Sequence, residues 1–209
     1  MKKIIFLLTG VFLFINTAQS QIDDRAVIPV AITLNSILRL TVTSGGNIEF
    51  NFNTLEDYRF GILTSPRYRT EFNVASSVNW NVYMYSENGT LIGTDIIQEG
   101  GNTFNTMPLD NIGFHVLPAA GATPDVEYPL TFSSSDPDNP VPLTSNENAI
   151  IVGYDGTNSN AGDIRTNSFA IQWECGTARG NMFDEPILDQ NLAADRYVTN
   201  VFLILQPAN

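Results

Sequence analysis

Apolar and polar residues alternate with a period of two along most of this chain, and the 3.6-residue period of an amphipathic helix is nearly absent. The alternating segments are residues 26–34, 38–42, 48–52, 72–74, 78–84, 112–116, 128–132, 149–154, 169–175 and 197–205. Clusters of glycine, proline, asparagine and aspartate separate them, as is typical of strands joined by turns. The pattern predicts an all-β chain of about ten strands, folded as an antiparallel β-sandwich of immunoglobulin-like or jelly-roll-like type.

Helix is expected only in short pieces, at residues 53–58 and 189–195, and long polar loops interrupt the second half of the chain. These loops are expected near residues 98–106, 118–125, 133–148 and 155–167. Loops of this length in a compact domain are commonly functional or mobile. No repeat or interdomain linker stands out, so residues 21–209 are expected to form a single domain. Residues 133–148 are the best position for a boundary between two subdomains.

The first 20 residues have the three parts of a secretory signal peptide. Lys2 and Lys3 precede an apolar run at residues 4–15, and Ala18 and Ser20 supply the small residues of a cleavage site. About a dozen apolar residues are fewer than the roughly 20 that a transmembrane helix needs. We therefore expect cleavage after residue 20 and export by the general secretory route. The mature chain is expected in the periplasm, at the cell surface or outside the cell, with no membrane anchor of its own.

The net charge of the mature chain limits the partners that it can bind. Both lysines lie in the expected signal peptide, so the mature protein carries eight arginines against 22 acidic residues, a net charge of −14. A surface this negative repels the phosphates of nucleic acid and of anionic membranes. Cys175 is the one cysteine, so no internal disulfide can form and stability has to come from packing or assembly.

Few residues of this sequence are candidates for catalysis. His115 is the only histidine, and the alternation in residues 112–116 predicts a half-exposed strand histidine. Cys175 shares the parity of Ile171 and Trp173, so we expect its thiol in the core, which argues against a Cys–His nucleophile pair. There is no Gly-x-Ser-x-Gly turn and no glycine-rich phosphate loop. We expect no enzyme. A glycosidase is a remote alternative, because two of the many carboxylates could form a catalytic pair.

Two loops, residues 135–139 and 155–163, are rich in the hard oxygen ligands that calcium prefers. The candidate ligands in the second loop are Asp155, Asn158, Asn160 and Asp163. Neither loop fits the EF-hand pattern, and asparagine, aspartate and glycine also form ordinary turns. A calcium site and a plain turn are both open interpretations, and no other cofactor is expected.

A candidate ligand site lies on the strand that contains Trp80. Asn81, Tyr83 and Tyr85 have the outward parity there, if Trp80 is buried. Exposed tyrosines beside an amide can stack on sugar rings and hydrogen-bond to their hydroxyls. They can equally pair with other aromatic side chains across strands or lie beneath a loop. The sequence leaves both interpretations open.

A candidate assembly edge follows the expected cleavage site directly. Ile28, Val30, Ile32 and Leu34 form an alternating apolar row, which can add to the open sheet of a neighbouring molecule. Residues 201–205 are apolar on both faces, so we expect cover on both sides rather than an open outer edge. The alternative is that both terminal strands pair within their own copy and close the sandwich.

The order of these features resembles a loose superfamily of exported bacterial β-sandwich proteins. A signal peptide precedes an alternating strand, a strand–turn–strand at residues 38–52 leads to Tyr58-Arg59-Phe60-Gly61, and the chain ends on residues 197–205. This order is similar to the spore-coat-protein-U-like, WxL-like and fimbrial-subunit-like domains. The lysine-free, asparagine-rich body is similar to envelope proteins of Bacteroidetes-type bacteria. The single cysteine departs from disulfide-bonded pilins, and Trp80-Asn81-Val82 is not a Trp-x-Leu motif.

The resemblance implies an exported, envelope-associated sandwich. With few candidates for catalysis, it predicts a non-enzymatic structural or adhesive protein of the bacterial cell envelope. Its expected partners are other envelope or surface proteins or copies of itself. A carbohydrate-binding module is the alternative.

Overall fold

The computed structural model describes residues 28–97, 104–119 and 130–208. The chain divides into two compact units, Met1–Leu34 and Asn35–Asn209. In the first unit, the described residues 28–34 form neither helix nor strand. The predicted strand at residues 26–34 is therefore wrong in its described part. The second unit contains all the regular structure described below.

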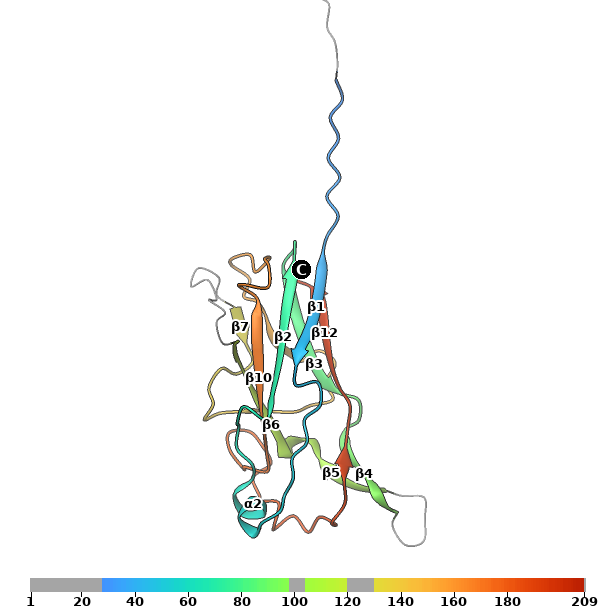
Figure 1. The fold of residues 1–209 in the computed structure, drawn as a ribbon, viewed down its shortest axis with the longest axis vertical. Helices are drawn as coiled ribbons and strands as arrows, with labels where there is room; N and C mark the ends of the chain where they lie inside the picture. The colour runs from blue at the N-terminus through green and yellow to red at the C-terminus, as the bar shows by residue number, and fades with distance from the viewer. Residues whose placement is uncertain (1–27, 98–103, 120–129, 209) are drawn as a thin grey trace, which may run out of the picture. The chain divides into compact units, whose positions relative to one another are not determined.

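Strands make up most of the second unit (Figure 1). They are β1 (Leu38–Ser44), β2 (Arg69–Ser76), β3 (Trp80–Ser86), β4 (Thr90–Ile97), β5 (Phe104–Pro108), β6 (Ile112–Pro118), β7 (Leu130–Phe132), β8 (Val141–Pro142), β9 (Ile150–Tyr154), β10 (Ser168–Cys175), β11 (Tyr197–Val198) and β12 (Val201–Pro207). The helices of the described residues are α2 (Leu55–Phe60) and a 3₁₀ turn at Leu109–Asn111. Neither could cross a membrane, and no described helix is long and apolar enough to do so.

The strands form three antiparallel sheets. The five-stranded sheet has the order β1-β2-β10-β6-β8, the four-stranded sheet β12-β3-β9-β7, and the three-stranded sheet β11-β4-β5. Side chains from both larger sheets meet in one hydrophobic core, so these sheets are the two layers of a sandwich (Figure 1). The predicted antiparallel β-sandwich with little helix is confirmed.

The core follows the alternation read from the sequence. Buried side chains recur at every second position of the strands β2, β3 and β10: Phe72, Val74, Trp80, Val82, Met84, Phe169, Ile171 and Trp173. The ring of Phe169 lies 5.4 Å from that of Phe72 and 5.8 Å from that of Trp80, between centroids. Trp80 is buried, so its predicted inward direction is confirmed. Strand geometry explains why the prediction was possible, since successive side chains of a strand point to opposite faces.

Trp80 is held by hydrogen bonds as well as by packing. Its backbone N–H donates to Oδ1 of Asn160 at 3.0 Å, and its indole Nε1–H donates to the Asn160 carbonyl at 2.7 Å. The Asn160 amide in turn donates to the Trp80 carbonyl at 2.8 Å. These bonds satisfy the polar groups of a fully buried tryptophan and tie residues 155–167 to β3.

The helix α2 begins at a capping box. The N–H of Asp57 donates to the Thr54 hydroxyl at 3.1 Å, and the N–H of Thr54 donates to the Asp57 carboxylate at 2.8 Å. Gly61, with φ of 72°, ends the helix in the left-handed region that glycine adopts freely. The helix expected at residues 53–58 is confirmed in position, whereas residues 189–195 form turns and no helix.

Residues 48–52 alternate like a strand but form none. Phe50 stacks on Tyr68 with centroids 4.6 Å apart, and Phe52 packs edge-on against Tyr58 at 5.4 Å. Because side-chain contacts rather than a backbone ladder hold this segment, the alternation reports its packing and not strand pairing. The strand prediction was wrong for this reason.

The loop predictions were correct in part. Residues 104–106 belong to β5, which pairs with β4, so the loop predicted at 98–106 was too long. The loop near 133–148 is interrupted by the short strand β8, and residues 155–167 form irregular structure apart from one isolated bridge. Residues 98–103 and 120–129 lie outside the described residues.

Candidate functional site

The strands β1 and β12 are neighbouring outer edges of the two larger sheets (Figure 1). The sheet partner of β1 is β2, and that of β12 is β3. Within the described ranges, no strand pairs with the other side of either. An uncovered edge presents backbone N–H and C=O groups that can pair with another chain.

The free side of β12 can be assigned from its neighbours. The N–H of Glu87 donates to the carbonyl of Asn200 at 2.9 Å, and the N–H of Ala208 donates to the carbonyl of Asn79 at 2.8 Å. Backbone groups of successive strand residues point to opposite sides, so the even-numbered residues of β12 face β3. The odd-numbered residues Val201, Leu203 and Leu205 therefore direct their backbone groups to the free edge.

The residues of β12 carry no charge, and its side chains are only partly covered. Leu203 and Leu205 pack against the core but are half-buried, and Val201 and Phe202 are 38% and 40% exposed. Strands at natural sheet edges usually carry a charge, a bulge or a covering loop. The expectation that residues 201–205 avoid an outer edge is wrong, because β12 is the end strand of its sheet in the described ranges. The expected cover on both faces is present in part, since Leu203 and Leu205 pack against the core and Tyr85 contacts Phe202.

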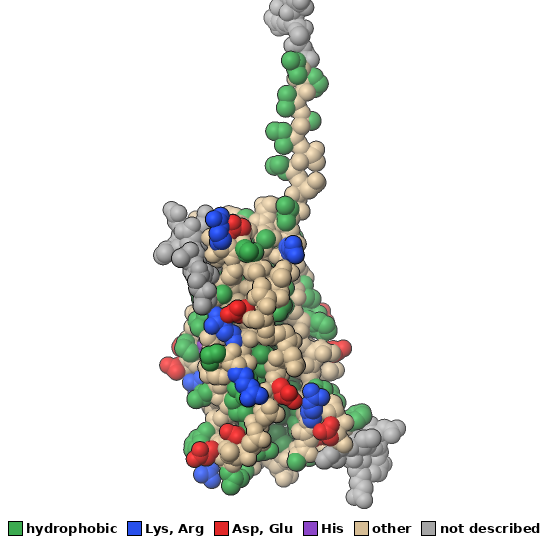
Figure 2. All heavy atoms as spheres, in the orientation of Figure 1, with side chains coloured by type: hydrophobic (Ala, Val, Ile, Leu, Met, Phe, Trp, Pro, Cys, Tyr) green, Lys and Arg blue, Asp and Glu red, His purple; other side chains and the backbone are tan. Residues whose placement is uncertain are grey.

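The predicted assembly row is exposed. Ile28, Val30, Ile32 and Leu34 are 79–89% exposed, and residues 28–34 contain no charged side chain. The described part of the N-terminal unit thus presents four large apolar side chains at every second position. Figure 2 shows apolar side chains exposed along this segment. Single exposed apolar residues are ordinary, whereas a periodic row of four is a feature of segments that pair with another chain.

The candidate ligand residues lie on the outward face of β3. Tyr83 and Tyr85 are half-buried there, and the ring of Tyr85 packs against Phe202 of β12 with centroids 5.3 Å apart. The side-chain oxygen of Asn81 accepts a hydrogen bond from the N–H of Tyr154 at 2.9 Å. The structure therefore brings the three residues onto one face, but it uses the Asn81 carbonyl oxygen to hold β9.

The candidate calcium ligands make separate local hydrogen bonds. Asp155 accepts hydrogen bonds from the hydroxyl and N–H of Thr157, which lower the pKa of its carboxyl. The side chain of Asp163 accepts a hydrogen bond from Arg165, which likewise lowers its pKa. Asn160 is buried against Trp80, and Asn158 is exposed. In the part of the chain that the structure describes, no three acidic, histidine or cysteine residues are grouped so that they could hold a metal.

Cys175 and His115 lie on opposite faces of the five-stranded sheet. Cys175 is 4% exposed among core side chains, and burial raises the pKa of its thiol to about 12. Its predicted place on the core face is confirmed. His115 faces the other way, but it is 1% exposed, so the half-exposed strand histidine was wrong.

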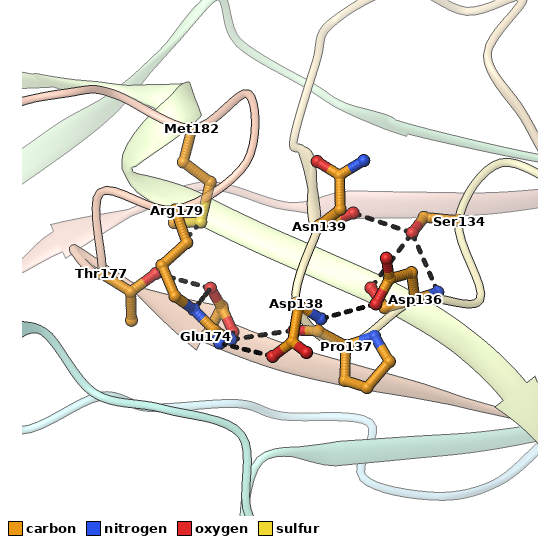
Figure 3. A network of polar contacts seen from close by, with 9 residues as sticks. All are labelled: Ser134, Asp136, Pro137, Asp138, Asn139, Glu174, Thr177, Arg179 and Met182. Carbon is orange, nitrogen blue, oxygen red and sulfur yellow. Dashed lines mark hydrogen bonds and ion pairs between the residues drawn. The ribbon is translucent and has the colours of Figure 1, made fainter.

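Sequence reasoning missed a polar network on that outer face. Glu174 is fully buried, and its carboxylate accepts hydrogen bonds from the guanidinium of Arg179 at 2.6 Å and from the Thr177 hydroxyl (Figure 3). Arg179 also reaches the Pro137 carbonyl at 2.9 Å and the Asp138 carboxylate at 3.5 Å. The outward parity of Glu174 was readable, whereas its cover by two loops depends on contacts between residues distant in sequence.

Comparisons with known proteins do not assign the chain to a family. No protein-family model matches the sequence, and no curated protein matches it significantly. The resemblance to exported β-sandwich domains therefore rests on the order of features described above.

Proposed function

We propose that this protein is an exported, non-enzymatic structural or adhesive protein of the bacterial cell envelope that assembles by strand addition. Residues 28–34 of one copy pair with the free edge of β12 in a second copy. The proposal depends on one observation above all. Among the described residues, an uncharged strand lies at a sheet edge with no strand paired to its outer side, and the N-terminal segment of the same chain exposes four alternating apolar side chains. Such edges and such rows are the two halves of β-augmentation.

The backbone chemistry of residues 28–34 is compatible with this pairing. In an extended chain the backbone groups of Ile28, Val30, Ile32 and Leu34 point to one side, and those of Pro29 point to the other. We propose that the apolar residues direct their N–H groups to β12. The missing N–H of Pro29 then faces away from the ladder, so it removes none of these hydrogen bonds.

The side chains on the inward face of β12 would gain cover from the added strand. Val201 is 38% exposed, and Leu203 and Leu205 are only half-buried. A second row of apolar side chains beside them removes further apolar surface from water, at about 25 cal/mol per Å². Assembly would therefore complete the core along the side where it is least covered.

Paired acidic substitutions test this proposal without touching the core. Val30→Asp/Ile32→Asp places two charges in the apolar row, and Ala31→Asp/Thr33→Asp places the same charges on the opposite face of the segment. Sedimentation velocity of the mature protein over a range of concentrations should show assemblies for the wild type and the control pair. The Val30→Asp/Ile32→Asp protein should be monomeric. Identical sedimentation of all three proteins would refute strand addition by this row.

A deletion of residues 21–34 distinguishes assembly from self-completion. The second unit has a hydrophobic core of its own, so the truncated protein should fold with unchanged circular dichroism. It should also sediment as a monomer at every concentration. Failure to fold would show that the segment belongs to the core of its own copy, and unchanged assembly would show that the segment takes no part.

A second candidate function, glycan binding, is favoured by the outward tyrosines of β3. The rings of Tyr83 and Tyr85 are half-buried on the outer face, beside the 40% exposed ring of Phe202. Aromatic rings with polar edges suit stacking on sugars. A glycan array should then give signals that Tyr83→Ala removes without changing sedimentation. Wild-type protein that binds no glycan would dismiss this candidate and leave the assembly proposal intact.

A further inference from the structure

Two loops cover the outward face of β6 and β10. Residues 133–140 lead into β8, and residues 176–183 follow β10. Arg179 connects them, because its guanidinium binds Glu174 of β10 at 2.6 Å and the Pro137 carbonyl of the other loop at 2.9 Å (Figure 3). The N–H of Val116 also donates to the Ser134 carbonyl at 2.8 Å, so the first loop is fixed to β6.

His115 is enclosed under these loops. It lies opposite Gln172 in the register of β6 and β10, and Gly113, on the same face of β6, lies opposite Glu174. Met182 fills the space over Gly113, where a Cβ atom would overlap its sulfur. The imidazole is 1% exposed, and its buried Nδ1 has no hydrogen-bond partner in the structure. A buried imidazole without a partner at this nitrogen holds a second proton poorly, because burial disfavours an unpaired charge.

The charges that face His115 come from three elements. Burial is the largest influence and lowers the pKa of His115. Glu174 of β10 acts in the opposite direction, Arg179 of the second loop lowers the pKa, and Asp136 of the first loop raises it. The carboxylate of Asp138 lies 3.5 Å from the Arg179 guanidinium and is 90% exposed. Gln172 lies between His115 on one neighbouring strand and Arg69 of β2 on the other. The guanidinium of Arg69 forms an ion pair with the Glu71 carboxylate at 3.1 Å.

We propose that the two loops form a latch over β6 and β10 that acid releases, with His115 as the group that takes up the proton. The closed latch encloses a neutral imidazole beside the Arg179 guanidinium, and a second cation there has no water to solvate it. Protonation is accommodated when residues 133–140 lift from the sheet and admit solvent. An exported protein meets the pH of its surroundings directly, so the latch would respond to external acidification.

The sign of the pH effect follows from linkage. The pKa of His115 in the closed latch lies below the ordinary value of about 6.5 that it regains when solvated. The open state therefore binds the proton more tightly than the closed state. The closed latch is fully stable above about pH 6.5 and loses stability as the pH falls below that value.

The test uses the fact that His115 is the only histidine of the chain. Its imidazole signals in a proton NMR titration belong to one residue, and they should report protonation coupled to a change in the loops. Hydrogen exchange of residues 133–140 and 176–183 should be measured at about pH 7.5 and about pH 5.5, on either side of the ordinary histidine pKa. After correction for intrinsic exchange, the wild-type loops should lose protection at the lower pH, by up to about tenfold, because pH 5.5 lies about one unit below the pKa of a solvated histidine.

Three variants make the result specific. His115→Gln keeps a polar side chain that does not titrate, so its loops should have equal protection at both pH values. His115→Leu serves the same purpose if the glutamine variant does not fold. Asp138→Asn changes a charge on the exposed side of the latch and should keep the acid release. Equal wild-type protection at both pH values, or acid release that persists without His115, would overturn the proposal.

Discussion

Breaking the buried ion pair between Arg179 and Glu174 should cost far more stability than breaking the exposed pair between Arg179 and Asp138. The Glu174 side chain has no exposed area, and the Arg179 side chain is 31% exposed. Arg179→Ala leaves the Glu174 carboxylate buried, with the Thr177 hydroxyl as its remaining partner among those above. Breaking one side of a buried pair costs about 3–5 kcal/mol. Because Arg179 is partly solvated, we expect the low end, about 3 kcal/mol.

Two further variants identify the origin of that cost. Asp138→Ala removes the other carboxylate that Arg179 contacts, at 3.5 Å, but its side chain is 90% exposed. An exposed pair contributes about 0.2–1 kcal/mol, so this variant should be close to the wild type. The double variant Arg179→Ala/Glu174→Gln removes the buried charge together with its partner. It should recover a large part of the loss, because an amide costs less than an unpaired carboxylate to bury.

Urea denaturation at neutral pH, followed by circular dichroism, measures all four proteins on one scale. The expected order of stability is wild type, Asp138→Ala, the double variant, and then Arg179→Ala. Surface substitutions usually change the free energy of unfolding by no more than about 0.5 kcal/mol. An Arg179→Ala protein whose free energy of unfolding lies that close to the wild-type value would show that the buried carboxylate needs no counter-charge. No recovery in the double variant would show that lost packing of the arginine stem, and not charge, sets the cost.

Three further outcomes are expected. Trp80→Ala should cost about 3–5 kcal/mol and Tyr83→Ala about 1 kcal/mol in urea denaturation, because Trp80 is fully buried and Tyr83 faces outward; equal midpoints would contradict the register of β3. Cys175 should react with a thiol reagent far more slowly in the native than in the denatured protein, because burial raises its pKa to about 12 and depletes the thiolate; equal rates would contradict its burial. Thr54→Ala should cost about 1 kcal/mol by removing the N-cap of α2, whereas Thr64→Ala, outside the cap, should cost less; equal losses would contradict the capping box.

Much of the fold was predictable because burial on a strand repeats every second residue. That geometry alone placed Trp80 and Cys175 in the core. The same reasoning failed at residues 48–52, where aromatic stacking produces alternation without a ladder. It also failed to predict the strand at Phe104–Pro108, which overlaps a stretch read as a polar loop.

The candidate sites were predictable to a lesser degree. Parity put Tyr83 and His115 on outward faces, and Glu174 has the opposite parity to the core residue Cys175, but alternation contains no information about what lies above a face. Residues 133–140 and 176–183 bury two of these three side chains, and their cover arises from contacts such as that of Arg179 with Pro137, 42 positions apart. The free edge of β12 was likewise not readable, because strand order depends on which distant segments pair.

Strand addition at β12 makes a direct prediction about which positions meet between copies. Neighbouring strands lie about 5 Å apart, within the distance of roughly 7 Å that a disulfide can span between Cα atoms. In a background without Cys175, one protein carries Ala31→Cys and a second carries Ile204→Cys, both on outward faces. A matched second protein carries Thr41→Cys on the outward face of β1, the neighbouring edge.

The decisive measurement is disulfide formation between these proteins after mixing and mild oxidation, read by mass spectrometry. Our account predicts a heterodimer that joins position 31 of one copy to position 204 of the other, with little product at position 41. It also predicts that Val30→Asp/Ile32→Asp in the first protein abolishes the heterodimer. Cross-linking to position 41 in preference to position 204, or no cross-link between copies at assembling concentrations, would contradict the account.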